Sequence, residues 1–93
     1  MFFVYMVRCA DGTLYTGFTR DVAARVGVHN SGKGAKYTRS RLPVSLVYVE
    51  PCDSLSAALK REHEIKPWSK AKKEALAAGD LETTSRGLNG SAV

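Results

Sequence analysis

The distribution of hydrophobic and polar positions predicts a β-hairpin at the start of the chain. Phe2–Arg8 is rich in aromatic and β-branched residues, which is typical of a strand. Leu14–Phe18 predicts the returning strand. The turn between them contains Asp11-Gly12, a pair that readily adopts the positive φ angles of a short hairpin. A hairpin centred on this turn would pair position 8 near position 15 and position 5 near position 18.

A helix is expected next, from Val22 to His29, with Thr19 or Asp21 as its N-cap. Its apolar face comprises Val22, Ala23, Val26 and Val28. The following segment, Lys33–Arg41, predicts a loop that can include a short helical turn. Val44–Glu50 then predicts a third strand.

Two further helices are expected in the second half of the chain. Ser54 can cap a helix from Leu55 to about Lys66, and Lys70–Ala78 forms another helix that Gly79 closes. The apolar candidates of the first of these helices are Leu55, Ala58, Leu59 and Ile65. Asp80–Val93 has few residues to bury, so we expect a flexible C-terminal tail after a folded domain at residues 1–79.

The order of the elements, ββαβαα, predicts an α+β fold in which a small three-stranded β-sheet is flanked by helices. The 93 residues suffice for one small domain. No apolar stretch approaches the roughly 18 residues of a membrane-spanning helix, and no secretory signal is visible. Cys9 and Cys52 are too few for a disulfide scaffold, so we expect two free thiols in a reducing cytoplasm.

The charge of the chain favours a polyanionic partner. Fourteen Lys and Arg residues stand against nine Asp and Glu residues, for a net charge of +5. On so small a protein this charge favours nucleic acid as the partner, although it is also compatible with an ordinary soluble domain.

Four features have residue types suited to chemistry on a phosphate. Tyr5 and Tyr15 lie on the two predicted hairpin strands and can share a face, but strand tyrosines are more often structural. Arg25 and His29 are four residues apart and share a helix face, as a charge clamp with a proton donor would, or as an ordinary solvated face would. Glu62 can be a ligand for one hard divalent cation or a surface ion-pair partner.

The fourth feature is the basic loop Lys33–Arg41, which contains no acidic residue. Basic side chains next to an aromatic ring suit a phosphate backbone and a stacked base, although a charged solvated loop has the same composition. The candidate nucleic-acid-binding residues are Lys33, Lys36, Tyr37, Arg39 and Arg41.

The order of these features is more specific than any one of them. The residues that carry it are Tyr5, Tyr15-Thr16-Gly17, Arg25, His29-Asn30, the stretch Gly32–Arg39, Pro43 and Glu62. In this order they resemble the GIY-YIG nuclease superfamily, most closely its small stand-alone bacterial members, over about Phe3 to Lys66.

The resemblance implies a metal-dependent phosphodiesterase that acts on DNA, in DNA repair or processing. Tyr15 would act as the general base or orient it, with Tyr5 close by, and Arg25 would contact the scissile phosphate. His29 would orient Tyr15 or donate a proton. Glu62 would hold one Mg²⁺ or Mn²⁺ ion.

Three departures from the family pattern are visible. The first motif is Val4-Tyr5-Met6 without a glycine, Phe18 stands where some relatives have a lysine, and no asparagine follows Glu62 at the distance found in some relatives. Without a separate sequence-reading domain, recognition of DNA shape is expected rather than of a long base sequence. The alternatives are a non-catalytic nucleic-acid-binding module and a nuclease subunit that needs a protein partner.

Overall fold

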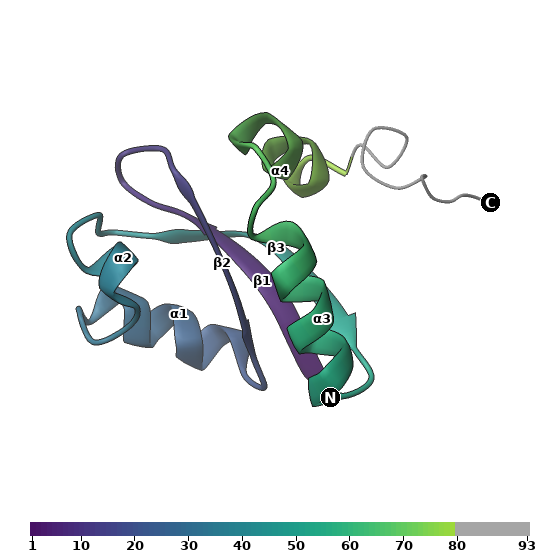
Figure 1. Cartoon of the computed structure of the whole chain (residues 1–93). Coiled ribbons are helices and arrows are strands. Elements are labelled where there is room, and N and C mark those ends of the chain that lie inside the picture. Colours follow the sequence, from purple (N-terminus) through teal and green to yellow (C-terminus); the bar gives the residue numbers. More distant parts are fainter. Residues whose placement is uncertain (80–93) are drawn as a thin grey trace.

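The computed structural model describes residues 1–79, which form an antiparallel three-stranded sheet with helices around it (Figure 1). In chain order the elements are β1 (Phe2–Arg8), β2 (Leu14–Thr19), α1 (Val22–Asn30), α2 (Lys36–Arg39), β3 (Ser45–Cys52), α3 (Leu55–Ile65) and α4 (Lys70–Ala77). The strand order is β2-β1-β3, so β1 is central. The predicted α+β fold is confirmed, and α2 is the short helical turn within the basic loop.

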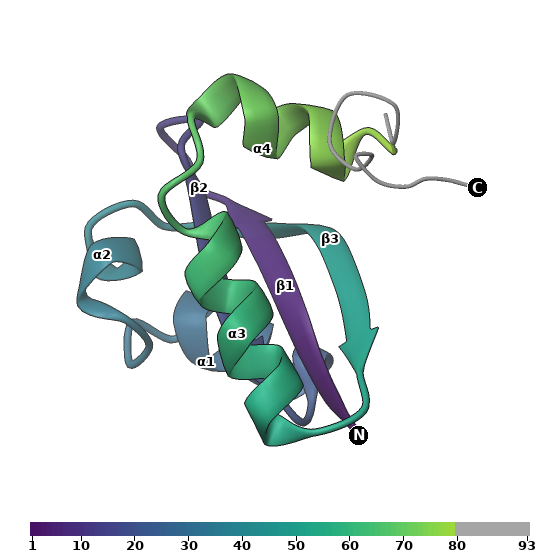
Figure 2. The same cartoon turned by 45° about the vertical axis from the view of Figure 1, so that its right-hand side comes forward.

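Helices cover both faces of the sheet (Figure 2). Because side chains alternate along a strand, β1 contributes to both faces. Val4 and Met6 belong to a buried cluster with α3 and α4, whereas Tyr5 and Val7 belong to a second cluster packed against α1. The central strand therefore joins two small cores.

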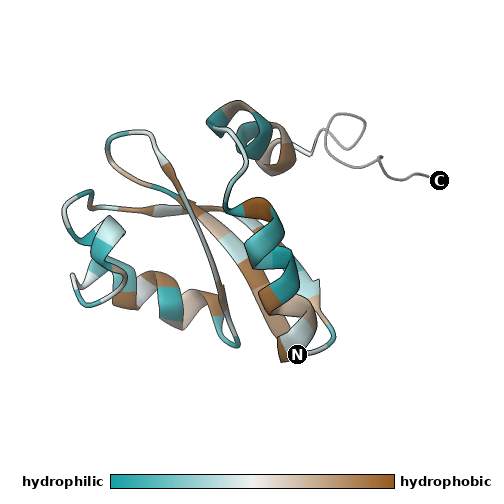
Figure 3. Ribbon diagram, in the orientation of Figure 1, coloured by the Kyte–Doolittle hydropathy of each residue, from teal (hydrophilic) through white to brown (hydrophobic). Residues whose placement is uncertain are grey.

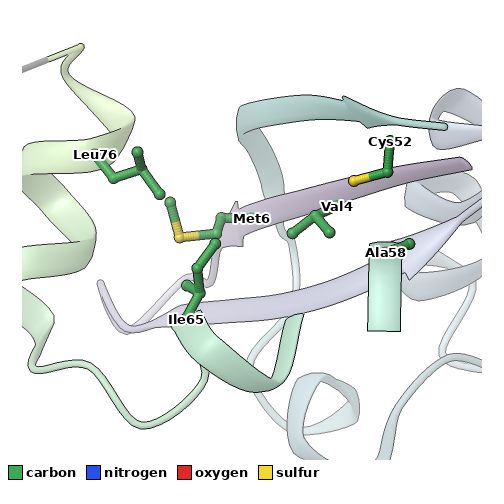
Figure 4. Packing of buried hydrophobic residues seen from close by; sticks show 6 residues of the cluster. All are labelled: Val4, Met6, Cys52, Ala58, Ile65 and Leu76. Carbon is green, nitrogen blue, oxygen red and sulfur yellow. The ribbon is translucent and has the colours of Figure 1, made fainter. Parts of the chain in front are cut away.

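The first core is centred on Met6, which lies beside Ile65 of α3 and Leu76 of α4 (Figure 4). Met6 and Ile65 are fully buried. Truncation of such a side chain to alanine typically costs about 2–5 kcal/mol. The helices carry bands of both hydrophilic and hydrophobic residues, as expected for helices that bury one side only (Figure 3).

The hairpin register differs by one residue from the predicted one. Tyr5 pairs with Gly17 rather than with position 18, and Arg8 pairs with Leu14 rather than with position 15. The cause is a five-residue turn, closed by a 2.8 Å hydrogen bond from the Cys9 N–H to the Thr13 carbonyl, with Gly12 at φ 87°. The observed register places Tyr15 opposite Val7, on the same face of the sheet as Tyr5.

The predicted element bounds need small corrections. Strand β3 covers Ser45–Cys52 instead of 44–50, and it is an edge strand, the position in a sheet where a proline such as Pro51 is tolerated. Strand β2 extends one residue further, to Thr19, and α1 ends at Asn30 instead of position 29. Helices α3 and α4 each end one residue earlier than predicted, at Ile65 and Ala77.

The N-caps follow the expected chemistry. Asp21, Ser54 and Ser69 each accept a hydrogen bond from the backbone N–H three residues further on. Cys9 and Cys52 are both free and buried. Among residues 1–79, no helix is long and apolar enough to cross a membrane. The predicted tail, 80–93, lies outside the described residues.

Candidate active site

One open cleft of about 780 Å³ contains all the residues predicted to be catalytic. It is lined by side chains from four elements, β1, β2, α1 and α3, and it includes Tyr5, Tyr15, Arg25, His29 and Glu62. These positions are up to 57 residues apart in the sequence, and only the fold brings them together. Lys33 of the basic loop lines the same cleft.

His29 and Glu62 lie on the buried faces of their helices, where an apolar residue would be expected. In α1 the inward face runs through Val22, Val26 and His29, a spacing of four and then three residues. Two predicted apolar positions of this helix, Ala23 and Val28, are exposed instead. The sequence analysis counted histidine as polar and so placed the face incorrectly.

The same pattern occurs in α3. Its buried residues are Ala58, Glu62 and Ile65, again four and three residues apart, whereas Leu55 is 45% exposed. A carboxylate on a buried helix face costs free energy unless it has a partner. Here Lys66 provides one, with its Nζ atom 3.2 Å from Glu62 Oε2.

A chain of hydrogen bonds fixes the His29 ring. The Thr38 hydroxyl donates its only proton to the Ala35 carbonyl at 2.9 Å, so it can only accept from His29 Nδ1, which lies 2.9 Å away. Nδ1 therefore carries the ring proton. His29 Nε2 is then an acceptor, and the Tyr5 hydroxyl donates to it at 2.8 Å.

Burial and nearby charge set the protonation states of this pair. Burial, assisted by the positive charge of Arg25, lowers the pKa of His29 below its usual value, so the imidazole is neutral near pH 7. Burial raises the pKa of Tyr5, with smaller contributions in the same direction from Tyr15 and Glu62. The pair is therefore a protonated phenol bonded to a neutral imidazole.

Two glycines make room for these rings. A Cβ atom at Gly17, the cross-strand partner of Tyr5, would lie 2.6 Å from the Tyr5 hydroxyl oxygen. A Cβ atom at Gly34 would lie 2.5 Å from His29 Nδ1. Both distances are far below contact distance, so the glycines are required for Tyr5 and His29 to occupy these positions.

Tyr15 differs from Tyr5 in its surroundings. Its ring packs edge-on against His29, with ring centroids 5.3 Å apart, and it is half-buried where it lines the cleft. His29 thus bonds to Tyr5 and packs against Tyr15, and the expectation that it orients Tyr15 or donates a proton stays a prediction.

The other candidate nucleic-acid-binding residues do not line this cleft; they are Lys36, Tyr37, Arg39 and Arg41. Arg41 is held within the loop, with its Nε atom 3.0 Å from Asp11 and its guanidinium 3.9 Å from the centre of the Tyr37 ring. Arg39 donates to the Gly34 carbonyl at 3.2 Å. Lys36 is exposed.

The donor set fits at most one loosely held divalent ion. Within residues 1–79, no group of three or more His, Cys, Asp or Glu side chains is arranged to hold a metal. Glu62 contributes a charged oxygen ligand to the cleft, as Mg²⁺ and Mn²⁺ prefer. Magnesium commonly retains several waters and binds through one carboxylate and substrate phosphate oxygens, so a single carboxylate is compatible with this group.

Thr38 and Gly34 belong to the stretch Gly32–Arg39 that carries the resemblance, but neither is among the predicted site residues. Both lie in the basic loop, where the positive charges drew attention to DNA contacts. The signal that could have identified Thr38 is a small polar residue inside a short helical turn close after His29. Asn30 also has a role that was not assigned: its side chain donates to the Val44 carbonyl at 3.0 Å and accepts from the Val44 N–H at 2.7 Å.

Paired tyrosines on a hairpin, a helix with arginine and histidine, and a glutamate on a third element are thus joined in one cleft of an α+β domain, as in GIY-YIG nucleases. Residues 1–75 match the family model described as the GIY-YIG catalytic domain. The chain belongs to the GIY-YIG family, which is a nuclease superfamily, and the resemblance is confirmed.

Small relatives cover nearly the same length. A UPF0213 protein of Natronomonas pharaonis is 59% identical over 78 residues, 84% of this chain and 92% of the relative. A UPF0213 protein of Staphylococcus aureus is 59% identical over 71 residues, 76% of this chain and 87% of the relative. The solution structure of a UPF0213 protein from Bacillus halodurans, 44% identical, covers 92% of this chain and 96% of its own, with a TM-score of 0.54.

Proposed function

We propose that the protein is a divalent-metal-dependent endonuclease that hydrolyses phosphodiester bonds in DNA. The observation that supports this most is the single cleft shared by Tyr5, Tyr15, Arg25, His29 and Glu62. The family supplies the reaction class. A role in DNA repair or processing, with recognition of DNA shape, is part of the proposal.

The resemblance implies Tyr15 as the general base, but the hydrogen bond between Tyr5 and His29 offers a different route for the proton of the attacking water. A phenol alone is a poor base at neutral pH because its pKa is about 10. As water attacks the phosphorus, the Tyr5 oxygen can accept its proton while the phenolic proton moves to His29 Nε2. Thr38 holds the imidazole in the tautomer that can accept it. The leaving oxygen takes a proton from solvent.

The other residues bind and orient the substrate. Arg25 is exposed in the cleft, where its charge can stabilise negative charge on the phosphate oxygens. Tyr15 lines the cleft and is half-buried, so its hydroxyl can orient the attacking water. Glu62 would hold one Mg²⁺ or Mn²⁺, and that ion would supply stabilisation of negative charge on the phosphate and the leaving oxygen.

Glu62→Gln is the sharpest test because it removes a charge and keeps the shape. A matched control is Glu64→Gln on the same helix, since Glu64 is 59% exposed and bonded to Arg61. We expect Glu62→Gln to abolish cleavage of linear, branched and single-stranded DNA in Mg²⁺ or Mn²⁺, with the fold intact by circular dichroism. Glu64→Gln should cleave as the unsubstituted protein does.

Arg25→Ala should also lose at least about 10²-fold in rate, a common effect of removing one group that stabilises the transition state. Full cleavage by Glu62→Gln would refute the metal assignment. If the unsubstituted protein binds all three DNAs and cleaves none, the nuclease proposal fails for the isolated chain.

A non-catalytic binding module is the second candidate, and one contact favours it. The Lys66 ammonium lies 3.2 Å from Glu62 Oε2, a carboxylate oxygen that a metal ion would need to reach. A partner-dependent nuclease subunit would have the same contact. Cleavage that appears only after addition of extract from the protein's own cells, and that Glu62→Gln abolishes, would identify the subunit.

A further inference from the structure

A second, smaller cleft lies at the sheet edge beside the candidate active site. It has a volume of about 260 Å³ and is formed by β2 together with residues after it in the chain. The residues that line it are Leu14, Tyr15, Thr16, Tyr37, Lys66 and Lys73. The proposed reaction uses only Tyr15 of this set.

The two clefts adjoin. Tyr15 lines both of them, and it therefore forms the wall between them. Glu62 of the first cleft and Lys66 of the second are one helical turn apart and bonded to each other. Residues of β2, an edge strand of the sheet, line both clefts. A polymer that lies in the first cleft can thus continue directly into the second.

The second cleft has the charge of an anion site. Lys66 and Lys73 line it, and no acidic side chain does. The nearest acid in sequence to Lys73, Glu74, is engaged by Arg8 at 2.5 Å and by Lys70 at 3.9 Å. Burial is the main cause that lowers the pKa of Lys73, and the positive charge of Lys66 lowers it further.

An unpaired polar group lies in the same place. Thr16 is 2% exposed, and among residues 1–79 its hydroxyl is the buried side-chain group that has no hydrogen-bond partner. A buried hydroxyl without a partner costs free energy, which a ligand oxygen could recover. Tyr15 and Tyr37, whose rings are stacked with centroids 6.1 Å apart, add an aromatic wall.

We infer that this second cleft binds the backbone phosphate of the nucleotide next to the scissile phosphate. Lys66 and Lys73 contact its oxygens, and Tyr15 and Tyr37 pack against the adjoining sugar or base. The inference rests on the proposed function, because it takes the first cleft as the position of the scissile phosphate. It assigns Lys73 a role in substrate positioning.

Lys73→Gln is the informative variant because Lys66 also contacts Glu62. The matched control is Lys72→Gln, which removes the same charge from the neighbouring position of α4. Lys72 lies over the Trp68 ring at 4.2 Å and does not line the cleft. Lys73→Arg keeps the charge and serves as the rescue variant.

The probe is a fluorescein-labelled single-stranded DNA, with binding measured by anisotropy in EDTA so that no cleavage occurs. Salt is varied between about 50 and 200 mM. Loss of one phosphate contact should reduce the slope of log affinity against log salt by about 0.7. We expect this reduction for Lys73→Gln, the unsubstituted slope for Lys73→Arg, and a smaller change for Lys72→Gln. Thermal melting of each variant controls for folding.

Each outcome bears on a different proposal. Equal slopes for Lys73→Gln and Lys72→Gln, or no binding of the probe by the unsubstituted protein, would overturn the subsite. If the slopes differ as expected but no DNA is cleaved in Mg²⁺ or Mn²⁺, the second cleft is a phosphate-binding site and the nuclease proposal fails.

Discussion

At the scale of the residue, the chemistry depends on which nitrogen of His29 carries the proton. The Thr38 hydroxyl decides this, because its own proton is donated to the Ala35 carbonyl and it can only accept from Nδ1. A side chain that never contacts the substrate thereby controls whether Nε2 can accept from Tyr5.

Thr38→Val keeps the shape of this fully buried side chain and removes the acceptor. The loss of one hydrogen bond, about 0.5–1.5 kcal/mol, should lower kcat by up to about tenfold with little change in KM. Thr38→Ser should restore it. NMR of ¹⁵N-labelled histidine gives a readout independent of activity: the Nδ1–H tautomer should dominate in the unsubstituted protein and decline in Thr38→Val. An Nε2–H tautomer in the unsubstituted protein would contradict the assignment.

The burial of His29 also predicts a pH dependence of stability. Its pKa is lowered in the folded state, so the unfolded chain binds more protons below about pH 6.5. The contribution of the neutral ring is therefore fully present above that pH and is lost as the pH falls toward the lower folded pKa. Tyr5, Tyr15 and Arg25 surround the ring.

Melting temperatures of His29→Gln and of the unsubstituted protein should therefore differ in their slope between about pH 7 and pH 5. The chain contains two histidines, and His63, whose side chain is 75% exposed, supplies the control. His63→Gln should keep the slope of the unsubstituted protein. The assignment is wrong if His29→Gln keeps it as well.

At the scale of the element, polar residues on the inward helix faces explain why the helices were predicted more accurately than the faces they bury. The strands and helices were predicted because their caps, turns and apolar content are local properties of the sequence. The helix faces were predicted only in part. Val26, Ala58 and Ile65 lie inward as expected, but His29 and Glu62 also occupy inward positions that a hydrophobic pattern assigns to apolar residues. Their burial depends on Tyr5 and Lys66, which lie on other elements or one turn further on.

The residues of the candidate site were predicted from the order of the motifs. The contacts between them could not be predicted in this way. The hairpin register was off by one residue, because Asp11-Gly12 signals a turn but not its length. The sequence places Thr38 in a short helical turn soon after His29, but only the fold shows that its hydroxyl lies 2.9 Å from His29 Nδ1.

Substitution of two glycines by alanine tests how tightly neighbouring elements pack. Gly17→Ala places a methyl group against the Tyr5 ring on the paired strand, and overpacking of this kind costs about 1–3 kcal/mol. Gly27→Ala, inside α1 with nothing within 4 Å of the added Cβ, should instead stabilise by about 0.5–1 kcal/mol. Urea denaturation measures both. A neutral effect at Gly17 would mean that Tyr5 moves freely and that its bond to His29 is weak.

At the scale of the whole molecule, the cations divide into those held by acids and those that are not. Within residues 1–79, the ion pairs engage Arg8, Arg41, Arg61, Lys66 and Lys70. Arg20, Arg25 and Lys33 line the candidate active site and are in none of these pairs. Unpaired positive charge is thus concentrated at the cleft, where it would attract a polyanion.

Lys36 and Arg39 extend this positive region through the short helix α2, and neither is in an ion pair of the described residues. Changing both to alanine should weaken duplex DNA binding and reduce the salt slope by up to about 0.9 for each lost phosphate contact. A double change of Lys60 and Lys72 to alanine removes the same charge from exposed positions on α3 and α4.

Comparison of the two double variants separates a local DNA contact from the effect of net charge alone. If DNA binding depends only on the net charge of the protein, both double variants should weaken it equally. If DNA contacts α2, only the double change of Lys36 and Arg39 should reduce the salt slope. Arg41 gives a further distinction, because its guanidinium is held by Asp11 at 3.0 Å. Arg41→Gln should therefore reduce the salt slope less than Lys36→Ala or Arg39→Ala does. A larger reduction would show that the loop opens on DNA binding and releases the Arg41 guanidinium from Asp11.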